Sequence, residues 1–120
     1  TPQFLEAAGS AAEGAIIIEN FLTGNDSPAV VDFNKRFKDR FGHDPSTFSA
    51  YAYDAINVLA EAVRRGGATR EGVFKALSDG GRWKTVQFGE FEFSADRRPG
   101  DVTLLPVTVK NGAYVPAEAS

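Results

Sequence analysis

The sequence contains no cysteine and no methionine among its 120 residues. Without cysteine, a disulfide framework and a thiolate metal site are excluded, but the compartment stays open, because exported proteins can also lack cysteine. No apolar run approaches the ~20 residues of a membrane-spanning helix, and the first residues lack the basic and apolar regions of a signal peptide. Because methionine is missing even at position 1, we expect a processed or excised piece whose signal, if any, lies upstream.

A strong excess of either charge is also missing. Thirteen lysines and arginines face sixteen aspartates and glutamates, which gives a net charge of -3. This balance provides no electrostatic attraction to nucleic acid or to an anionic membrane. The composition leaves open a small ligand of low charge, and the 42% hydrophobic content fits one globular domain or part of a larger one.

Helix signals occur in four places. Apolar residues at helical spacing, followed by Gly9, predict a short helix within residues 1–10. The capping residues before Pro28 predict a second helix that ends at Gly42, with Val30, Phe33, Phe37 and Phe41 inward. A third helix is expected from Ser46 to Arg65, mostly buried because apolar residues surround most of it, and a fourth from Thr69 to Ser78, with Val73, Phe74 and Leu77 inward.

The remaining segments predict strands. The uninterrupted run Ile16-Ile17-Ile18 is typical of a central strand in a parallel sheet, covered on both faces. From Trp83 the period becomes two: Val86 and Phe88 share one face, and a bulge or bend at Gly89 puts Phe91 and Phe93 on another. After a turn-rich stretch at 95–101, residues 102–109 form a strand, in which Pro106 requires an edge or irregularity on one flank. The Asn111-Gly112 pair predicts a two-residue hairpin turn that leads into Tyr114 and Val115.

The Ile16–Ile18 strand has no visible parallel partner within the chain. A parallel strand needs a neighbour reached through a crossover connection, and no such unit precedes it. Exposing one isoleucine costs on the order of 1.5 to 3 kcal/mol, against a typical domain stability of about 5 to 15 kcal/mol. The missing cover is therefore expected from the remainder of a parent chain or from a second copy that completes the sheet.

Four segments resemble the C-terminal portion of type I periplasmic solute-binding proteins, such as the branched-chain amino-acid-binding proteins of ABC importers. They are Ala11-Ala12-Glu13-Gly14, FNKRFKDRFGHDP at 33–45, AYAYDA at 50–55 and FGEFEFSAD at 88–96. They occur in the same order and at similar spacing, and the likeness covers nearly the whole chain. Each is weak alone, but the series is specific.

The resemblance implies an α/β fold with two parallel-sheet lobes and flanking helices, of which this chain is a C-terminal fragment that closes with antiparallel strands. Residues 1–18 would hold the end of the second lobe and a crossover strand. Residues 19–97 would supply helices and strands of the first lobe, and residues 98–120 the strands that return to the second lobe.

The resemblance also implies a function, namely the substrate-binding component of an ABC importer, which holds a branched-chain amino acid or similar carboxylate or amide by lobe closure. Its partners would be the small-molecule ligand and the permease subunits, and its location would be periplasmic or extracellular. The resemblance implies neither enzymatic activity nor a cofactor nor binding to nucleic acid. The same fold also serves ligand-sensing domains of receptors and regulators. An α/β enzyme would need a glycine-rich strand-to-helix turn or a catalytic dyad, and neither is visible.

The candidate ligand-binding residues are Phe48, Ser49 and Tyr51, which resemble cleft-facing positions of some family members. They stand at the start of the third helix, where backbone N–H groups and aromatic walls suit a small carboxylate. The alternative is that two aromatics at helical spacing are ordinary core. The family's main ligand-binding loops lie upstream, so the ligand itself stays open.

Other polar residues favour structural roles. Asp54, next to Tyr53, lacks a nucleophile or base to work with and is expected as a hinge-side or surface acceptor. His43 beside Asp44 lies in a turn and lacks nearby metal ligands, so no metal site is predicted. A basic cluster on the second helix is interleaved with Asp32 and Asp39 and indicates a solvated face; its members are Lys35, Arg36, Lys38 and Arg40. The glycine pairs at 66–67 and 80–81 stop helices rather than bind phosphate.

Overall fold

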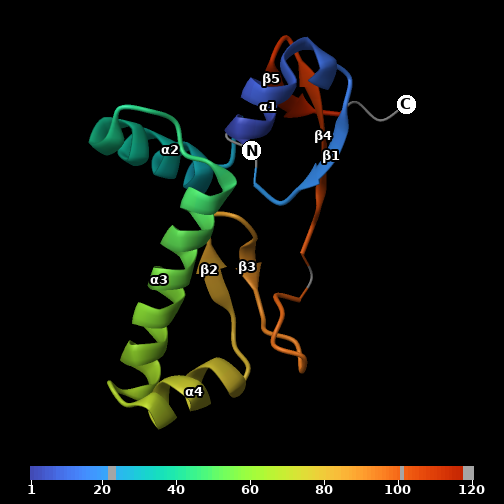
Figure 1. The fold of residues 1–120 in the computed structure, drawn as a ribbon. Coiled ribbons are helices and arrows are strands. Elements are labelled where there is room, and N and C mark those ends of the chain that lie inside the picture. The colour runs from blue at the N-terminus through green and yellow to red at the C-terminus, as the bar shows by residue number, and fades with distance from the viewer. Residues whose placement is uncertain (22–23, 101, 118–120) are drawn as a thin grey trace. The chain divides into compact units, whose positions relative to one another are not determined.

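The computed structural model describes residues 1–21, 24–100 and 102–117. The chain divides into two compact units, which Figure 1 shows as a ribbon. The first unit comprises residues 1–48 and 103–120, and the second comprises residues 49–102. Asp101, the last residue of the predicted turn at 95–101, lies outside the described residues.

The first unit begins with two short helical segments. Helix α1 spans Pro2–Ala8; the Thr1 side chain accepts a hydrogen bond from the amide of Phe4, and Gly9 ends the helix at a φ of 52°. The 3-10 helix η1, Gly9–Ala12, continues the chain and buries Ala12. The predicted helix and its glycine stop are confirmed.

Helix α2, Pro28–Phe41, also begins and ends as predicted. The Ser27 hydroxyl accepts a hydrogen bond from the amide of Val30, and Gly42 closes the helix in the left-handed conformation. Val30 and Phe33 are buried, and the Phe33 ring meets Phe21 edge-on at 6.0 Å. Phe41 is 54% exposed, so the predicted inward face is buried only in its first half.

Three strands form the sheet of the first unit in the order β1-β4-β5. They are β1 Ile16–Glu19, β4 Leu105–Lys110 and β5 Ala113–Pro116, and both pairings are antiparallel. The prediction of a central strand in a parallel sheet at Ile16–Ile18 is therefore wrong for this chain. Strand β1 lies at the sheet edge, and its partner comes from near the other end of the sequence.

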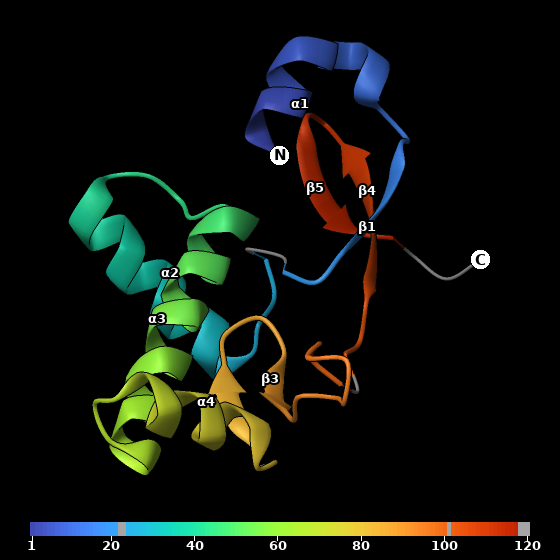
Figure 2. The same cartoon turned by 60° about the horizontal axis from the view of Figure 1, so that its bottom comes forward.

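The two faces of this sheet differ in burial. Ile17 is paired with Val107, and residues directly opposite each other share a face, where Val107 and Val109 are almost completely buried. Figure 2 shows α1 and η1 beside the β4–β5 hairpin. Ile16 and Ile18 belong to the other face and are 72% and 58% exposed. The isoleucine run thus has cover on one side only, because none of the described residues forms a layer on the other.

The β4–β5 hairpin turns as the sequence predicts. Lys110 is paired with Ala113, and the two residues between them, Asn111 and Gly112, have φ values of 54° and 72°. Positive φ at both positions is the two-residue turn that matches strand twist. The β4–β5 ladder ends with the pair Val107 and Pro116, so Pro106 lies just beyond it. Its carbonyl accepts from the amide of Ala117, and its missing N–H falls at this end of the ladder, on one flank as predicted.

The second unit contains most of α3 (Thr47–Gly66), followed by α4 (Arg70–Ser78) and a hairpin. The hairpin pairs β2 (Trp83–Thr85) with β3 (Gly89–Phe91) in antiparallel register. Gly89, at a φ of 65°, follows the turn, which confirms the predicted bend. Val86 and Phe88 were expected on a strand face, but they lie in the turn itself.

The core of this unit is a cluster between α3 and the hairpin. Val58, Ala62, Trp83 and Phe91 are buried at its centre, and half-buried side chains surround them: Val73, Ala76, Leu77, Phe88 and Phe93. Phe91 and Phe93 lie on one face as predicted, with their rings edge-on at 5.0 Å. The Arg65 guanidinium covers the Trp83 ring at 4.2 Å. Phe74, predicted inward, is 56% exposed.

Helix α3 is less buried than its composition predicts. Only one stripe is buried, made of Ala50, Asp54, Val58 and Ala62 at four-residue spacing. On another side, Ile56 is 67% exposed, Leu59 46% and Val63 40%. The prediction of a mostly buried helix is wrong for this chain. Apolar side chains indicate that a helix surface favours burial, but they do not show that the same chain provides the residues to bury it.

The corner between α3 and α4 is unusually tight. A Cβ atom built on Gly66 would lie 2.0 Å from the carbonyl oxygen of Gly72, and one built on Gly72 would lie 2.0 Å from that of Gly66. The two backbones therefore touch with no side chain between them. Thr69 caps α4 between these glycines, as predicted, by accepting from the amide of Gly72.

Candidate functional site

The three predicted ligand-binding residues lie in the first two turns of α3. Phe48 is 68% exposed, Tyr51 is 41% exposed, and Ser49 is half-buried. Phe48 ends the first unit, whereas Ser49 and Tyr51 begin the second. Phe48 therefore does not belong to the core that the described residues form, and its role in a ligand site stays a prediction.

Tyr51 has a defined neighbour within the second unit. Its ring lies 6.4 Å from the ring of Phe88, centroid to centroid, in a tilted arrangement. Phe88 in turn meets Phe91 edge-on at 5.8 Å. Tyr51 therefore lies at the exposed end of an aromatic row that leads into the core, where one edge is packed and another remains accessible.

Asp54 is a hydrogen-bond acceptor, as predicted. The predicted surface position is wrong, because the residue is buried, with 6% of its surface exposed. Its Oδ1 accepts a hydrogen bond from the amide of Val86 at 2.8 Å, and its Oδ2 accepts one from Gln87 at 3.0 Å. Burial raises the pKa of Asp54, and these two amides oppose the rise.

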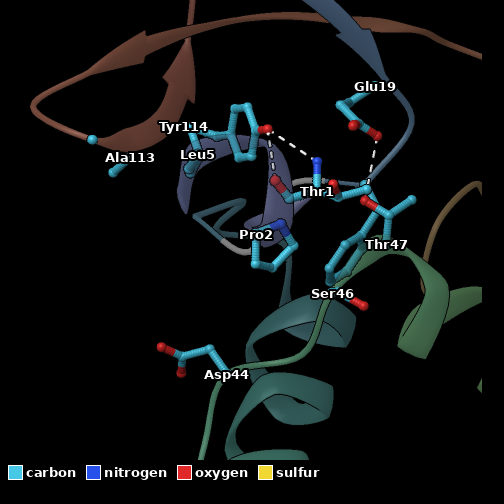
Figure 3. A pocket seen from close by; sticks show the side chains of 11 residues that line it. Thr1, Pro2, Leu5, Glu19, Asp44, Ser46, Thr47, Ala113 and Tyr114 are labelled. Carbon is cyan, nitrogen blue, oxygen red and sulfur yellow. Dashed lines mark hydrogen bonds between the residues drawn. The ribbon is translucent and has the colours of Figure 1, made fainter. Parts of the chain in front are cut away.

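A hollow of about 340 Å³ opens within the first unit, as Figure 3 shows. It lies among the start of α1, the end of β1, the segment before α3 and the β4–β5 turn. Its polar lining includes Glu19, Asp44, Ser46, Thr47 and Tyr114. Sequence reasoning missed it, although a carboxylate that directly follows an isoleucine run is a signal for a polar group at a strand end.

Hydrogen bonds cross this hollow between distant segments. The Thr47 hydroxyl donates to Glu19 at 3.3 Å, and the Tyr114 hydroxyl donates to the backbone carbonyl of Thr1 at 3.1 Å. Burial raises the pKa of the Tyr114 phenol, and the negative charge of Glu19 raises it further. Tyr114 is thus a neutral hydrogen-bond donor at the edge of the hollow.

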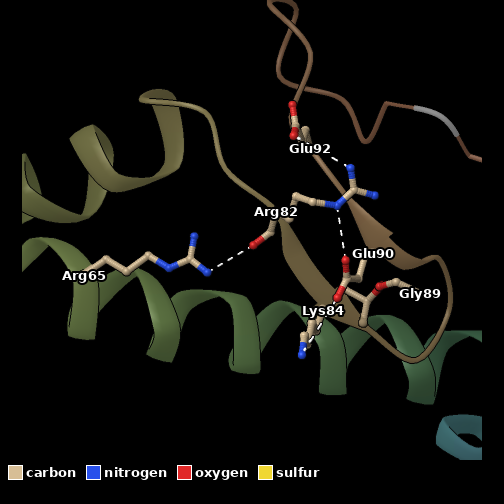
Figure 4. Close-up of polar contacts among 7 residues, drawn as sticks. Arg65, Arg82, Lys84, Gly89, Glu90 and Glu92 are labelled. Atoms are coloured by element: carbon tan, nitrogen blue, oxygen red, sulfur yellow. Dashed lines mark hydrogen bonds and ion pairs between the residues drawn. The ribbon is translucent and has the colours of Figure 1, made fainter.

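The charged surface residues pair with one another. Figure 4 shows Arg82 between Glu90 and Glu92, at 3.2 and 3.9 Å, and Lys84 near Glu90 at 3.8 Å. Glu90 and Glu92 are exposed, and they alternate along the chain with Phe91 and Phe93. Arg65 donates to the carbonyl of Arg82 at 3.1 Å. This surface is balanced in charge and offers no uncompensated patch for an anion.

The basic cluster of α2 is a solvated face, as predicted. Lys35 pairs with Asp39 at 2.7 Å, Arg36 with Asp32 at 2.8 Å, and Lys38 with Asp44 at 3.1 Å. All six side chains are more than half exposed. Such exposed pairs contribute little to stability.

His43 lies in an exposed turn, with its Nδ1 2.9 Å from the carbonyl oxygen of Asp44. Over residues 1–21, 24–100 and 102–117, no group of three or more histidine, cysteine, aspartate or glutamate side chains could hold a metal. Within the same ranges, no helix combines the length and the apolar character that crossing a membrane requires.

Comparison with known proteins gives a consistent result. A sequence model of the family described as "Periplasmic binding protein" matches residues 1–113. No curated protein matches the sequence. A solved structure of a putative branched-chain amino acid ABC transporter from Rhodospirillum rubrum is 29% identical, with a TM-score of 0.73, over 98% of this chain and 34% of that chain.

Two further structures share the fold at lower identity. A leucine-binding protein from Thermotoga maritima is 22% identical with a TM-score of 0.84, over 98% of this chain and 34% of that one. A solute-binding protein of an ABC transporter from R. palustris, in complex with benzoate, is 23% identical with a TM-score of 0.79, over 93% and 31%. The chain therefore spans about one third of each related structure.

Proposed function

The chain belongs to the periplasmic binding protein family, and from that premise we propose that it is the C-terminal part of the substrate-binding component of an ABC importer. Its work is to help hold a small organic solute by lobe closure and to deliver it to permease subunits in the periplasm or outside the cell. It makes or breaks no bond in the solute. The match over residues 1–113 carries this proposal.

The incomplete cover of the fold supports a partner within the same protein. Ile16 and Ile18 expose one face of the sheet, and Ile56, Leu59 and Val63 expose one side of α3. Large apolar surfaces of this kind mark interfaces. Since related structures are about three times as long, we assign the missing cover to the remainder of a parent chain, with a second copy as the alternative.

We further propose the lobe assignment that the resemblance implies. Residues 1–18 and 98–120 belong to the second lobe, and residues 19–97 belong to the first. The pairing within the sheet supports the assignment of residues 1–18 and 98–120 to one lobe. Strand β1, mainly from the first of these ranges, pairs along its length with β4, from the second. The two crossings of the chain would then lie near residues 18–19 and 97–98.

The ligand site that we propose on this chain is the start of α3. Phe48, Ser49 and Tyr51 would contribute one wall of the cleft, opposite loops of the parent chain. The first amides of a helix have no partner within it and favour an anion. Leucine and benzoate, which appear in the names of two related structures, each combine a carboxylate with an apolar body. A small carboxylate of this kind is the proposed ligand class.

Calorimetric titration of the full reading frame with leucine and with benzoate tests the proposal. Tyr51→Ala should weaken binding by roughly 1 to 3 kcal/mol per folded molecule, the value of a lost buried aromatic contact. Phe74→Ala is the matched control, because Phe74 is also an exposed aromatic of the second unit and is 56% exposed. Equal affinity of wild type and Tyr51→Ala removes Tyr51 from the site, and catalytic turnover of either solute overturns the transport assignment.

A further inference from the structure

The buried carboxylate of Asp54 has a specific task in the second unit. It lies on α3, three residues after Tyr51, and both of its oxygens accept backbone amides of one turn, those of Val86 and Gln87. No arginine, lysine or histidine forms an ion pair with it among the described residues. A buried ionised group is costly unless hydrogen bonds compensate it, so the turn and the carboxylate depend on each other.

The same turn is held from within by Thr85. Its hydroxyl accepts a hydrogen bond from the amide of Phe88 at 3.1 Å and donates one to the carbonyl of Gly89 at 3.0 Å. Three successive amides, from Val86 to Phe88, therefore have side-chain acceptors. The backbone that carries the Phe88 ring is fixed at each residue.

Phe88 connects this turn with the candidate ligand wall. Its ring contacts Tyr51 on one side and Phe91 of the core on the other. Asp54 and Tyr51 of the same helix thus both contact this turn. Asp54 accepts hydrogen bonds from the backbone of the turn, and Tyr51 packs against the Phe88 ring. An aromatic ring with a fixed neighbour loses fewer orientations when a ligand packs against it, which favours binding.

We propose that Asp54 is a positioning residue for the ligand wall: its carboxylate fixes the turn at residues 86–88, and Phe88 of that turn holds the Tyr51 ring in one orientation. The effect on ligand affinity rests on the proposed function. The effect on the two rings does not, because it concerns contacts within the second unit. A role limited to stability would leave the ring contact and the affinity per folded molecule unchanged.

The test compares Asp54→Asn with Val58→Ala. Asparagine keeps the shape but places an amide group against a backbone N–H, so one hydrogen bond is lost. Val58 lies one turn further along α3 in the buried core, so its truncation costs stability without removing an acceptor from the turn. Thr85→Val is a second variant in case Asp54→Asn does not fold, because it removes the Thr85 hydroxyl that bonds to the same turn.

Two readouts decide the proposal. In this 120-residue chain, nuclear Overhauser contacts between the Tyr51 and Phe88 rings should disappear in Asp54→Asn and in Thr85→Val and persist in Val58→Ala. In the full reading frame, the turn variants should bind leucine or benzoate about two- to tenfold more weakly per folded molecule, the contribution of one aromatic contact. Persistent ring contacts, or unchanged affinity after their loss, overturn the proposal. If wild type binds neither solute, the proposed function fails, while the ring contacts still decide the positioning role.

Discussion

The two units reach a buried core by different routes. In the first, the sheet pairs Ile17 with Val107, so strands from opposite ends of the sequence must meet. In the second, one continuous segment from Ser49 to Val102 folds upon itself around Trp83. Closing a long loop costs chain entropy before any contact forms. The second unit therefore depends on contacts within one continuous segment, whereas the first depends on pairing between distant segments. Substitutions in one unit can test its stability independently of the other.

The largest effect is expected at the centre of the second unit. Trp83 is 1% exposed, and Trp83→Ala should cost about 3 to 5 kcal/mol through lost burial and the cavity that remains. Amide hydrogen exchange should show the loss of protection mainly in α3, β2 and β3. Phe74→Ala, at an exposed position of the same unit, should change the free energy of unfolding by less than about 1 kcal/mol. Equal losses in the two variants would contradict this core.

The turn of the first unit should give a smaller effect. Gly112 has a φ of 72°, and valine in the left-handed region costs about 1 to 2 kcal/mol. Gly112→Val should therefore lower the free energy of unfolding by this amount, measured by urea titration. Asn111→Gly at the neighbouring position keeps the turn accessible and should be nearly neutral. An unchanged midpoint in Gly112→Val would count against the turn.

The buried carboxylate of the second unit predicts a pH dependence. Because burial raises the pKa of Asp54 in the folded state, the folded protein binds its proton more tightly than the unfolded chain does. This contribution to stability is fully present at a pH below the pKa that Asp54 has in the unfolded chain. It is lost as the pH rises through the pKa that Asp54 has in the folded protein. The free energy of unfolding of wild type minus that of Asp54→Asn should thus increase as the pH falls from neutral towards 4. A difference independent of pH would show that the pKa is not raised.

The smallest effect is expected on the uncovered sheet face of the first unit. Ile18 is 58% exposed, so Ile18→Thr should change the stability of this chain by no more than about 0.5 kcal/mol. The same change in the full reading frame should cost more, because the proposed cover is then present. Thermal unfolding of both proteins with and without the substitution makes the comparison. A large loss in the short chain would mean that Ile18 is already packed.

Local features made much of the fold predictable. The caps at Ser27 and Thr69 and the glycine stops at Gly9 and Gly42 act within a few residues of the helix ends, so the sequence shows them directly. The Asn111-Gly112 turn is equally local. The order of helices and strands followed from these signals.

Long-range features were not predictable in the same way. A run of isoleucines is compatible with a parallel or an antiparallel partner, and only the return of β4 decides it. Periodicity identified the apolar sides of α3 but not which of them the chain covers. Asp54 was expected as a hinge-side or surface acceptor, and its burial depends on a turn more than thirty residues later in the sequence. Phe48, Ser49 and Tyr51 remain predicted ligand contacts, because only a bound ligand can test them.

The corner between α3 and α4 also limits which sequences can adopt this fold. Because a methyl group at Gly66 or Gly72 would lie 2.0 Å from a backbone oxygen, neither position admits alanine or any larger residue without separating the helices. Separation would withdraw Val73 and Leu77 from the side of the Trp83 cluster. Two glycines six positions apart, between a long helix and a short capped one, therefore form a sequence marker by which the same corner can be recognised in other chains.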